Sequence, residues 1–287
     1  MIRANFIERW LDRFCEPAGV RACVQAIEFR EDHARCTEKA RAILAPVEFA
    51  RFQRLRSAKR ASEFLAGRIA AKRLLCQAPF GLDDSECVVS TSSAGAPFIE
   101  GRAGIHVSIS HSGSVAVAVA ATHRIGIDIE ENVDRPTSLL RFFYGPRERA
   151  VVDAMEGEKR TAFVNELWCR KEAACKVGHW GAALCFSDLE GLGARVTVED
   201  SVLGLRSGVV DGLAAALAWE TSPGFSAAES RPKFATAAHV TRTRVTRVTR
   251  GQTAVATIER GNFGTDVCVR ASSGPFGHIE AREVRRG

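Results

Sequence analysis

Two acidic residues stand two positions apart in the apolar run "IGIDIEE" (125–131). If this run is a strand, its side chains alternate between two faces, so the isoleucines point one way and Gly126, Asp128 and Glu130 point the other. The two carboxylates then lie roughly 7 Å apart along the strand, a distance that one hard cation or one shared proton can bridge. Taken alone, the pattern fits a solvated strand face better.

A second group of reactive side chains occurs in "WCRKEAACK" (168–176). On a helix, Glu172 and Lys176 are four residues apart and share a face with Trp168. By itself this spacing describes an ordinary helix ion pair worth about 0.2–0.5 kcal/mol. It gains meaning only if the helix lies close to the acids of the strand.

The third group is "SISHSGS" (108–114), in which Ser110 and His111 precede a glycine turn. Hydroxyls, an imidazole and backbone N–H groups in a turn can bind a phosphate. Taken alone, the more common interpretation is a turn whose serines cap nearby backbone groups. No G-x-S-x-G motif is present, so the sequence gives poor support to a serine hydrolase.

The spacing of apolar residues predicts the elements that must position these groups. An amphipathic helix is expected near the start of the chain, with Ile7, Trp10, Leu11 and Phe14 on its apolar face. Further helices are expected at residues 45–55, 61–75, 135–155 and 158–178, and strands at residues 20–29, 105–110, 115–121, 124–130, 194–200 and 212–220. The linkers "HSGS" and "THR" are short enough for antiparallel hairpins. We therefore expect an α/β (α+β) body with mixed sheets.

The composition excludes several classes of protein. Apolar residues make up 46% and charged residues 26% of the chain, as in an ordinary globular protein. The apolar runs are too short to span a bilayer and the first residues lack the apolar core of a secretory signal, so we expect a cytoplasmic protein without a membrane partner. Nine cysteines without a C-x-x-C pair indicate reduced thiols in a reducing compartment.

The positive charge is concentrated at the C-terminal end. From Arg231 onward there are 11 Lys/Arg and 4 Asp/Glu residues, a net charge of +7, so the preceding 230 residues carry −1 of the total of +6. A nucleic-acid partner is therefore not expected for the body. The run "HVTRTRVTRVTRG" (239–251) is of low complexity, and we expect residues 231–287 to form a disordered or loosely packed extension, with a docking element as the alternative.

In combination, the three groups resemble a known family, the 4'-phosphopantetheinyl transferases of the long monomeric surfactin-synthetase-activating type. The strand "GIDIE" (126–130) and the helix "WCRKEAACK" (168–176) match its two specific motifs. "SISHS" (108–112) and "FLAGRIAAKRLL" (64–75) stand where the family carries its upstream motifs. The resemblance covers about residues 30–225, with all four motifs in the family's order.

The resemblance implies a pseudo-twofold pair of similar subdomains, residues 1–121 and 122–230, with coenzyme A and Mg²⁺ bound in the cleft between them. It implies a monomer that moves 4'-phosphopantetheine from coenzyme A to a serine of an acyl or peptidyl carrier protein and releases adenosine 3',5'-bisphosphate. Acidic carrier helices would suit a basic surface near the cleft, for which Arg141, Arg147, Arg149 and Arg170 are candidates.

The resemblance also assigns roles to individual residues. Asp128, Glu130 and Glu172 are the expected metal ligands, since carboxylates are what Mg²⁺ prefers, and Mn²⁺ suits the same oxygens. Asp128, Glu172 and Lys176 are the expected catalytic residues: Glu172 accepts the proton of the carrier serine and Lys176 reaches the phosphates. Further contacts with coenzyme A are expected from Lys59, Arg60, Arg68, Ser110 and His111.

The sequence departs from the family pattern at several positions. Ala96 occupies the place of a lysine in the usual G-K-P, so one cationic phosphate contact is missing or is supplied by another residue. "KVGHWGAAL" (176–184) keeps only loosely the family's ending of the second motif. The alternative to a transferase is a catalytically silent protein on the same fold that binds coenzyme A or a carrier.

Overall fold

The computed structural model describes residues 2–26, 33–83, 86–178, 186–198 and 201–221, together with the backbone of residues 253–257, 266–272 and 279–284. Contacts divide the chain into two units at Ser222/Pro223. None of the helices in these ranges is both long and apolar enough to cross a membrane. The predicted extension from residue 231 lies mostly outside the described residues.

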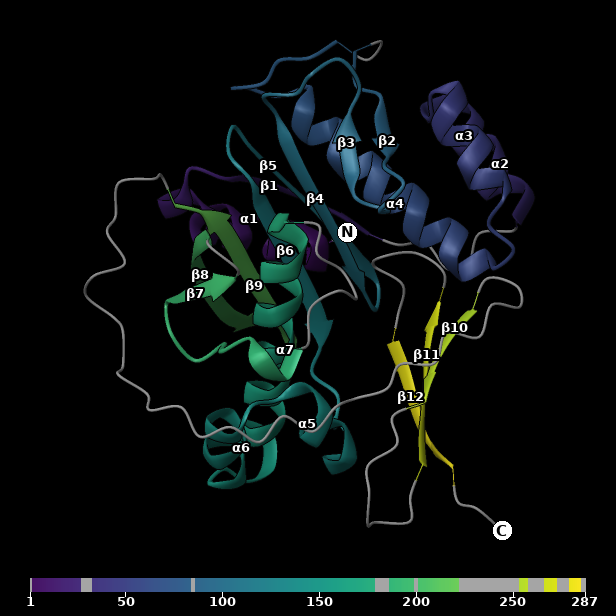
Figure 1. Cartoon of the computed structure of the whole chain (residues 1–287). Coiled ribbons are helices and arrows are strands. Elements are labelled where there is room, and N and C mark those ends of the chain that lie inside the picture. The colour runs from purple at the N-terminus through teal and green to yellow at the C-terminus, as the bar shows by residue number, and fades with distance from the viewer. Residues whose placement is uncertain are drawn as a thin grey trace. The chain divides into compact units, whose positions relative to one another are not determined.

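The first unit contains two antiparallel sheets (Figure 1). The first has the order β1-β5-β4 and the second the order β6-β9-β8-β7. Their strands are β1 (Arg21–Ala26), β4 (His106–Ser112), β5 (Val115–Ala121), β6 (Ile125–Glu131), β7 (Arg195–Val198), β8 (Ser201–Val210) and β9 (Leu213–Glu220). A small hairpin pairs β2 (Val89–Thr91) with β3 (Pro97–Ile99).

The helices of the first unit are α1 (Ile2–Cys15), α2 (His33–Ile43), α3 (Pro46–Gln53), α4 (Ala58–Leu75), α5 (Thr137–Phe143), α6 (Pro146–Asp153) and α7 (Gly157–Gly178). The α/β fold class predicted from the sequence is confirmed. One predicted helix, residues 135–155, is in fact the pair α5 and α6, because Gly145 and Pro146 interrupt it and Pro146 starts the second helix.

Two expectations about the sheets are wrong. Every strand pair among the described residues is antiparallel, so the sheets are not mixed. The linker "HSGS" does join a hairpin, in which Gly113 has a φ of 53° that favours glycine. The linker "THR" does not, because β6 pairs with β9 and thereby starts the second sheet.

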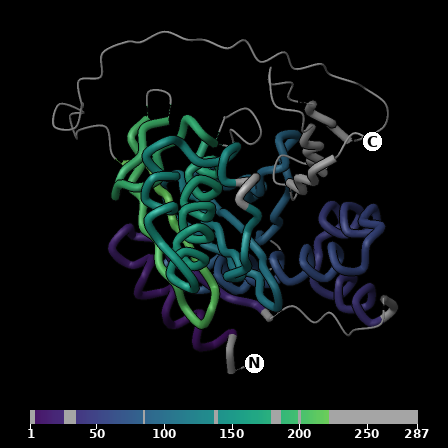
Figure 2. Tube along the Cα trace, turned by 90° about the horizontal axis from the view of Figure 1, so that it is seen from below, coloured from purple at the N-terminus to yellow at the C-terminus, as the bar shows by residue number. Residues whose placement is uncertain are grey.

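Helices cover both faces of the two sheets. The odd-numbered residues of β5 and the isoleucines of β6 pack in one core with α1. Ala118 and Ala120 of β5 pack with α4, and Ala214, Ala216 and Ala218 of β9 pack with α7. Figure 2 shows α1, in purple, and α7, in teal, on opposite sides of the strands. A single helix therefore lies behind both sheets, and α4 and α7 cover the other face.

The two halves repeat one structural device. Glu48 in α3 and Glu148 in α6 each follow a helix-starting proline by two residues and accept a hydrogen bond from the backbone N–H three residues earlier. Each also accepts a second backbone N–H from a distant loop or strand, at Val89 and Gly191 respectively. A lysine from the following long helix completes each ion pair, Lys72 at 2.9 Å and Lys171 at 2.6 Å. This repetition agrees with the expected pseudo-twofold pair of subdomains.

The second unit contributes three described strands, β10 (Thr253–Thr257), β11 (Asp266–Ser272) and β12 (Ile279–Val284). They form one antiparallel sheet in the order β10-β11-β12. The low-complexity run 239–251 lies outside the described residues, so the expectation of disorder there stays a prediction.

Candidate functional site

The site lies where the two sheets meet. There β4 and β6 lie side by side, but they are not paired by backbone hydrogen bonds as strands of one sheet are. Instead, alternate serines of β4 accept hydrogen bonds from the backbone N–H groups of β6. Ser108 pairs with Ile127 at 3.1 Å, Ser110 with Ile129 at 3.3 Å and Ser112 with Glu131 at 2.9 Å. We call these three residues the serine seam. The constant offset of the pairs shows that β4 and β6 run in the same direction.

Asp128 is buried at this seam. Its Oδ1 accepts hydrogen bonds from Ser110 Oγ at 2.8 Å and from Lys176 Nζ at 2.7 Å. Lys176 also donates to the carbonyl of Ile127 at 2.9 Å. Asp128 Oδ2 is buried and has no hydrogen-bond partner among the described residues. A buried carboxylate oxygen without a partner is costly, so this atom is suited to a cation.

Helix α7 brings Glu172 and Lys176 to the acids of β6, and Gly126 makes this approach possible. A Cβ at Gly126 would lie 2.0 Å from the carbonyl oxygen of Ala173, far inside contact distance. The glycine of "GIDIE" therefore sets the distance between strand and helix. The prediction from the sequence gave Gly126 no role.

The charges of the site act on one another. Burial, and then the charge of Asp128, raise the pKa of Glu172 to about 7, and Glu130 has a pKa raised to about 7 for the same reasons. Burial of Lys176 alone would lower its pKa, but the carboxylates of Asp128 and Glu172 outweigh that effect and raise it. Three carboxyl groups thus compete for too little positive charge.

The three predicted metal ligands are therefore close enough to repel one another, but they are not closed around an ion. Among the described residues, no group of three or more His, Cys, Asp or Glu side chains is arranged to hold a metal. Lys176 donates a hydrogen bond to one oxygen of Asp128, and Ser112 donates one to Glu130 at 3.3 Å. The donor set, an unpartnered carboxylate oxygen with two acids of raised pKa, suits Mg²⁺ or Mn²⁺ chemically.

Ser110 and Arg68 make contacts that the sequence did not predict for them. Ser110 is 6% exposed, and its hydroxyl holds Asp128 and the backbone of β6. Arg68 is also 6% exposed; it donates to Thr91 at 2.9 Å and lies 3.7 Å from Glu48. Their predicted contacts with coenzyme A stay predictions, and for both residues a protein partner already occupies the side chain.

The other predicted phosphate contacts gather around a residue that the sequence analysis missed. Glu63 of α4, which is 6% exposed, lies 3.8 Å from both Lys59 Nζ and His111 Nδ1. Lys59 is largely exposed, and Arg60 is exposed beside it. Ala96, in place of the family's lysine, is buried, and its N–H donates to Ser92 at 3.1 Å.

Arg135 is a second residue that the sequence analysis missed. It follows β6 and lies 3.6 Å from Glu130, while its guanidinium lies 4.7 Å from the centre of the Trp168 ring. No motif marks it, because an arginine before a proline in a loop has no characteristic spacing. Arg170 donates to the carbonyls of Gly191 and Gly193 and to Ser207, and its predicted contact with a carrier stays a prediction.

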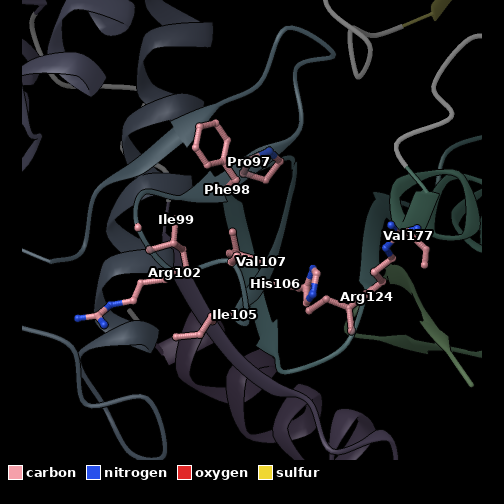
Figure 3. Close-up of a pocket in the computed structure, with 12 residues that line it drawn as sticks. Pro97, Phe98, Ile99, Arg102, Ile105, His106, Val107, Arg124 and Val177 are labelled. Atoms are coloured by element: carbon pink, nitrogen blue, oxygen red, sulfur yellow. The ribbon is translucent and has the colours of Figure 1, made fainter. Parts of the chain in front are cut away.

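A pocket of about 570 Å³ opens at the other end of β4 and β6. It is lined by the first residues of both strands, by β3 and by Val177 in the last turn of α7. Figure 3 shows His106 and Arg124 next to each other on its wall, and the charge of Arg124, after burial, lowers the pKa of His106. The pocket therefore offers an apolar wall and two exposed arginines, Arg102 and Arg124.

Comparison with known proteins assigns most of this unit to one family. Residues 50–121 match the model of the 4'-phosphopantetheinyl transferase N-terminal domain, and residues 124–220 match the model of the 4'-phosphopantetheinyl transferase superfamily. The first match takes in α4, β4 and β5, and the second takes in β6 and α7. Together the two segments cover more than half of the 287 residues.

Individual relatives agree with the family models. A 4'-phosphopantetheinyl transferase of Bacillus subtilis is 30% identical over 105 residues, which are 37% of this chain and 47% of the relative. One of Bacillus pumilus is 25% identical over 190 residues, 66% of this chain and 78% of the relative. One of Nostoc is 31% identical over 150 residues, 50% of this chain and 62% of the relative. The chain thus spans about half the length of the Bacillus subtilis relative.

A solved structure, the holo-[acyl-carrier-protein] synthase of Thermotoga maritima, aligns with 19% identity and a TM-score of 0.27 over 34% of this chain and 62% of that chain. That likeness is too small to support an argument. The two family models are stronger evidence, because they match in succession the two halves that meet at the serine seam. The chain belongs to the 4'-phosphopantetheinyl transferase superfamily.

Proposed function

We propose that this chain transfers 4'-phosphopantetheine from coenzyme A to a serine of an acyl or peptidyl carrier protein. The observation that carries the proposal is the convergence of Asp128, Glu130, Glu172 and Lys176 in a chain of this superfamily. In the reaction, the serine oxygen bonds to the phosphorus of the pantetheine phosphate. The anhydride bond to the second phosphate breaks, and adenosine 3',5'-bisphosphate leaves with the electron pair.

Glu172 is the proposed general base for the serine. A base works best when its pKa lies near the working pH, and a value of about 7 meets this condition. Lys176, with its raised pKa, keeps its charge and offers its ammonium to the phosphates. Ser110 supports Lys176, because its hydroxyl donates to the same oxygen of Asp128 that accepts a hydrogen bond from Lys176.

Asp128, Glu130 and Glu172 would hold a divalent metal, Mg²⁺ or Mn²⁺, through their carboxylate oxygens. When bound, the metal neutralises the negative charge of the diphosphate. A bound cation would also offset the burial and the charge of Asp128, which together raise the pKa values of Glu130 and Glu172. Lys59, Arg60 and His111 are proposed for the 3'-phosphate, and the pocket beyond Val107 has room for the pantetheine arm.

The test is intact-mass spectrometry of an apo carrier protein incubated with this chain, coenzyme A and Mg²⁺, with EDTA as the control. We expect the carrier to gain one phosphopantetheine group, and the gain to disappear with EDTA. Glu172→Gln should lose the gain and still bind coenzyme A, which is measured by calorimetry. Folded protein that binds coenzyme A and modifies none of a panel of fatty-acid, polyketide and peptide carriers would favour the silent binding protein.

We further propose a cytoplasmic, monomeric enzyme whose carrier partner docks near α5, α6 and α7. Arg147 supports this placement, since its side chain is 70% exposed and lies 3.8 Å from Glu190. Arg141 is also exposed, and Arg149, which is half-buried, donates to the carbonyl of Arg141. Exposed arginines can meet the acidic helices that the resemblance implies for a carrier.

A further inference from the structure

Arg135 makes contacts that the proposed chemistry does not yet use. It lies in the segment between β6 and α5, and 15% of its side chain is exposed. One terminal nitrogen lies 3.6 Å from Glu130 Oε2. Among the described residues, Nε is the only nitrogen of this guanidinium that donates a hydrogen bond, to Asn165 Oδ1 at 2.8 Å.

Two residues of α7 lock the guanidinium in this position. Asn165 is fully buried, and its amide nitrogen donates to the carbonyls of Val133 and Thr161, both at 2.8 Å. Asn165 therefore fixes the backbone of the segment that carries Arg135 as well as the side chain itself. The face of Trp168 covers the guanidinium at 4.7 Å, which is cation–π contact distance.

These contacts connect one stripe of α7 to the strand. Asn165, Trp168, Glu172 and Lys176 follow one another at spacings of three or four residues, which places them on one side of the helix. Lys176 holds Asp128, and Arg135, supported by Asn165 and Trp168, holds Glu130. Asp128 and Glu130 thus each have their own cation.

We propose that Arg135 is a positioning residue that holds the Glu130 carboxylate in the place where it meets the metal. This inference rests on the proposed function. The planar guanidinium suits the task, because Nε donates to Asn165 and the guanidinium lies over the Trp168 ring, while a terminal nitrogen remains for Glu130. Partners of metal ligands typically change metal affinity by about 10–100-fold when they are removed.

The experiment measures Mn²⁺ binding to the full chain by electron paramagnetic resonance, beside the transfer assay at saturating Mn²⁺. Arg135→Gln is expected to raise the Kd for Mn²⁺ at least tenfold. The KM for coenzyme A should stay within a factor of two. Arg160→Gln is the matched control, because Arg160 belongs to α7 and lies 4.0 Å from Asp134, away from Glu130; its Kd should equal that of the unchanged protein.

Arg135→Lys separates position from charge and also serves if Arg135→Gln does not fold. Lysine keeps the charge but lacks the planar fork, so we expect it to restore less than half of the lost binding free energy. If Arg135 acted only as a positive charge that repels the metal, Arg135→Gln would lower the Kd for Mn²⁺. An unchanged or lower Kd in this variant would therefore overturn the inference. So would full restoration by lysine. Failure of the proposed function is distinct, since the unchanged protein would then neither bind Mn²⁺ nor modify a carrier.

Discussion

Replacing Glu172 by glutamine tests whether its carboxyl belongs to a cluster of acids that repel one another. Burial, and then the charge of Asp128, raise the pKa of Glu172 to about 7 from an ordinary value of 4.5. At about 1.36 kcal/mol per pKa unit, this disfavours the charged carboxyl in the folded protein by roughly 3 kcal/mol. Glu172 keeps partial contact with solvent and shares the repulsion with Glu130, so we expect about 1–2 kcal/mol from this residue alone.

The sign follows from the two pKa values of the same group. A carboxyl whose pKa is higher in the folded protein destabilises the fold fully above the folded value, near 7, and not at all below the unfolded value, near 4.5. Glutamine is neutral throughout. In the absence of metal, Glu172→Gln should therefore raise the free energy of unfolding by about 1–2 kcal/mol at pH 8, and most of this gain should disappear at pH 5.

Urea unfolding in EDTA, followed by tryptophan fluorescence, measures this difference at both pH values. Glu158→Gln is the control, because Glu158 is exposed in the first turn of the same helix. Its effect should be below about 0.5 kcal/mol. A variant at Glu172 that is less stable at pH 8, or equally stabilised at both pH values, would refute the repulsion. In the transfer assay, Glu172→Gln should lower kcat by about 10²–10⁴ as expected for a lost base.

Three further predictions concern the seam, the strand–helix approach and the carrier surface. Ser110→Ala removes both hydrogen bonds of that hydroxyl and should lower the free energy of unfolding by about 1–3 kcal/mol together with kcat; unchanged unfolding would contradict the bridge. Gly126→Ala should lower kcat because α7 must move outward, whereas Gly104→Ala, which meets no atom within 4 Å, should not; equal rates would exclude the close approach. Charge reversal at Arg147 and Arg149 should raise the KM for the carrier and not that for coenzyme A in initial-rate measurements.

The site's acids could be predicted from the sequence because each lies in an element with a strong period. Ile127 and Ile129 are fully buried in the core with α1, so Asp128 and Glu130 face the other way, toward α7, as the alternation requires. Glu172 and Lys176 share the helix face predicted for them. Periodicity predicts the face of an element on which a side chain lies. The resemblance to the transferase family was needed to predict that this strand and this helix lie next to each other.

The partners of Ser110 and Arg68 could not be predicted, because each is fixed by another element. Ser110 meets a strand of the other sheet, and no local pattern shows that β4 and β6 lie side by side. Arg68 meets Glu48, whose place two residues after Pro46 indicates only a helix cap. In both cases a long-range contact fixes the side chain, and local sequence patterns do not indicate such contacts.

Strand β8 was missed for a packing reason. Gly204 and Gly208 interrupt the alternation by which strands are recognised. A Cβ at Gly204 would lie 2.3 Å from the ring of Trp219, and one at Gly208 would lie 3.2 Å from the ring of Trp10. The glycines make room for two large rings, one on β9 and one on α1, and neither ring is near them in the sequence.

Helix α1 has a consequence for how the protein is made. Its buried residues share one core with β1 and β5, and equally with Ile127 of β6 and Leu217 of β9. At roughly 5–20 residues per second, the ribosome needs about 10–40 s after finishing α1 to supply Leu217. During that time the apolar stripe of the helix lacks half of its partners. An N-terminal fragment ending at residue 121 would lack them permanently, so the two halves share one core and complete their folding together.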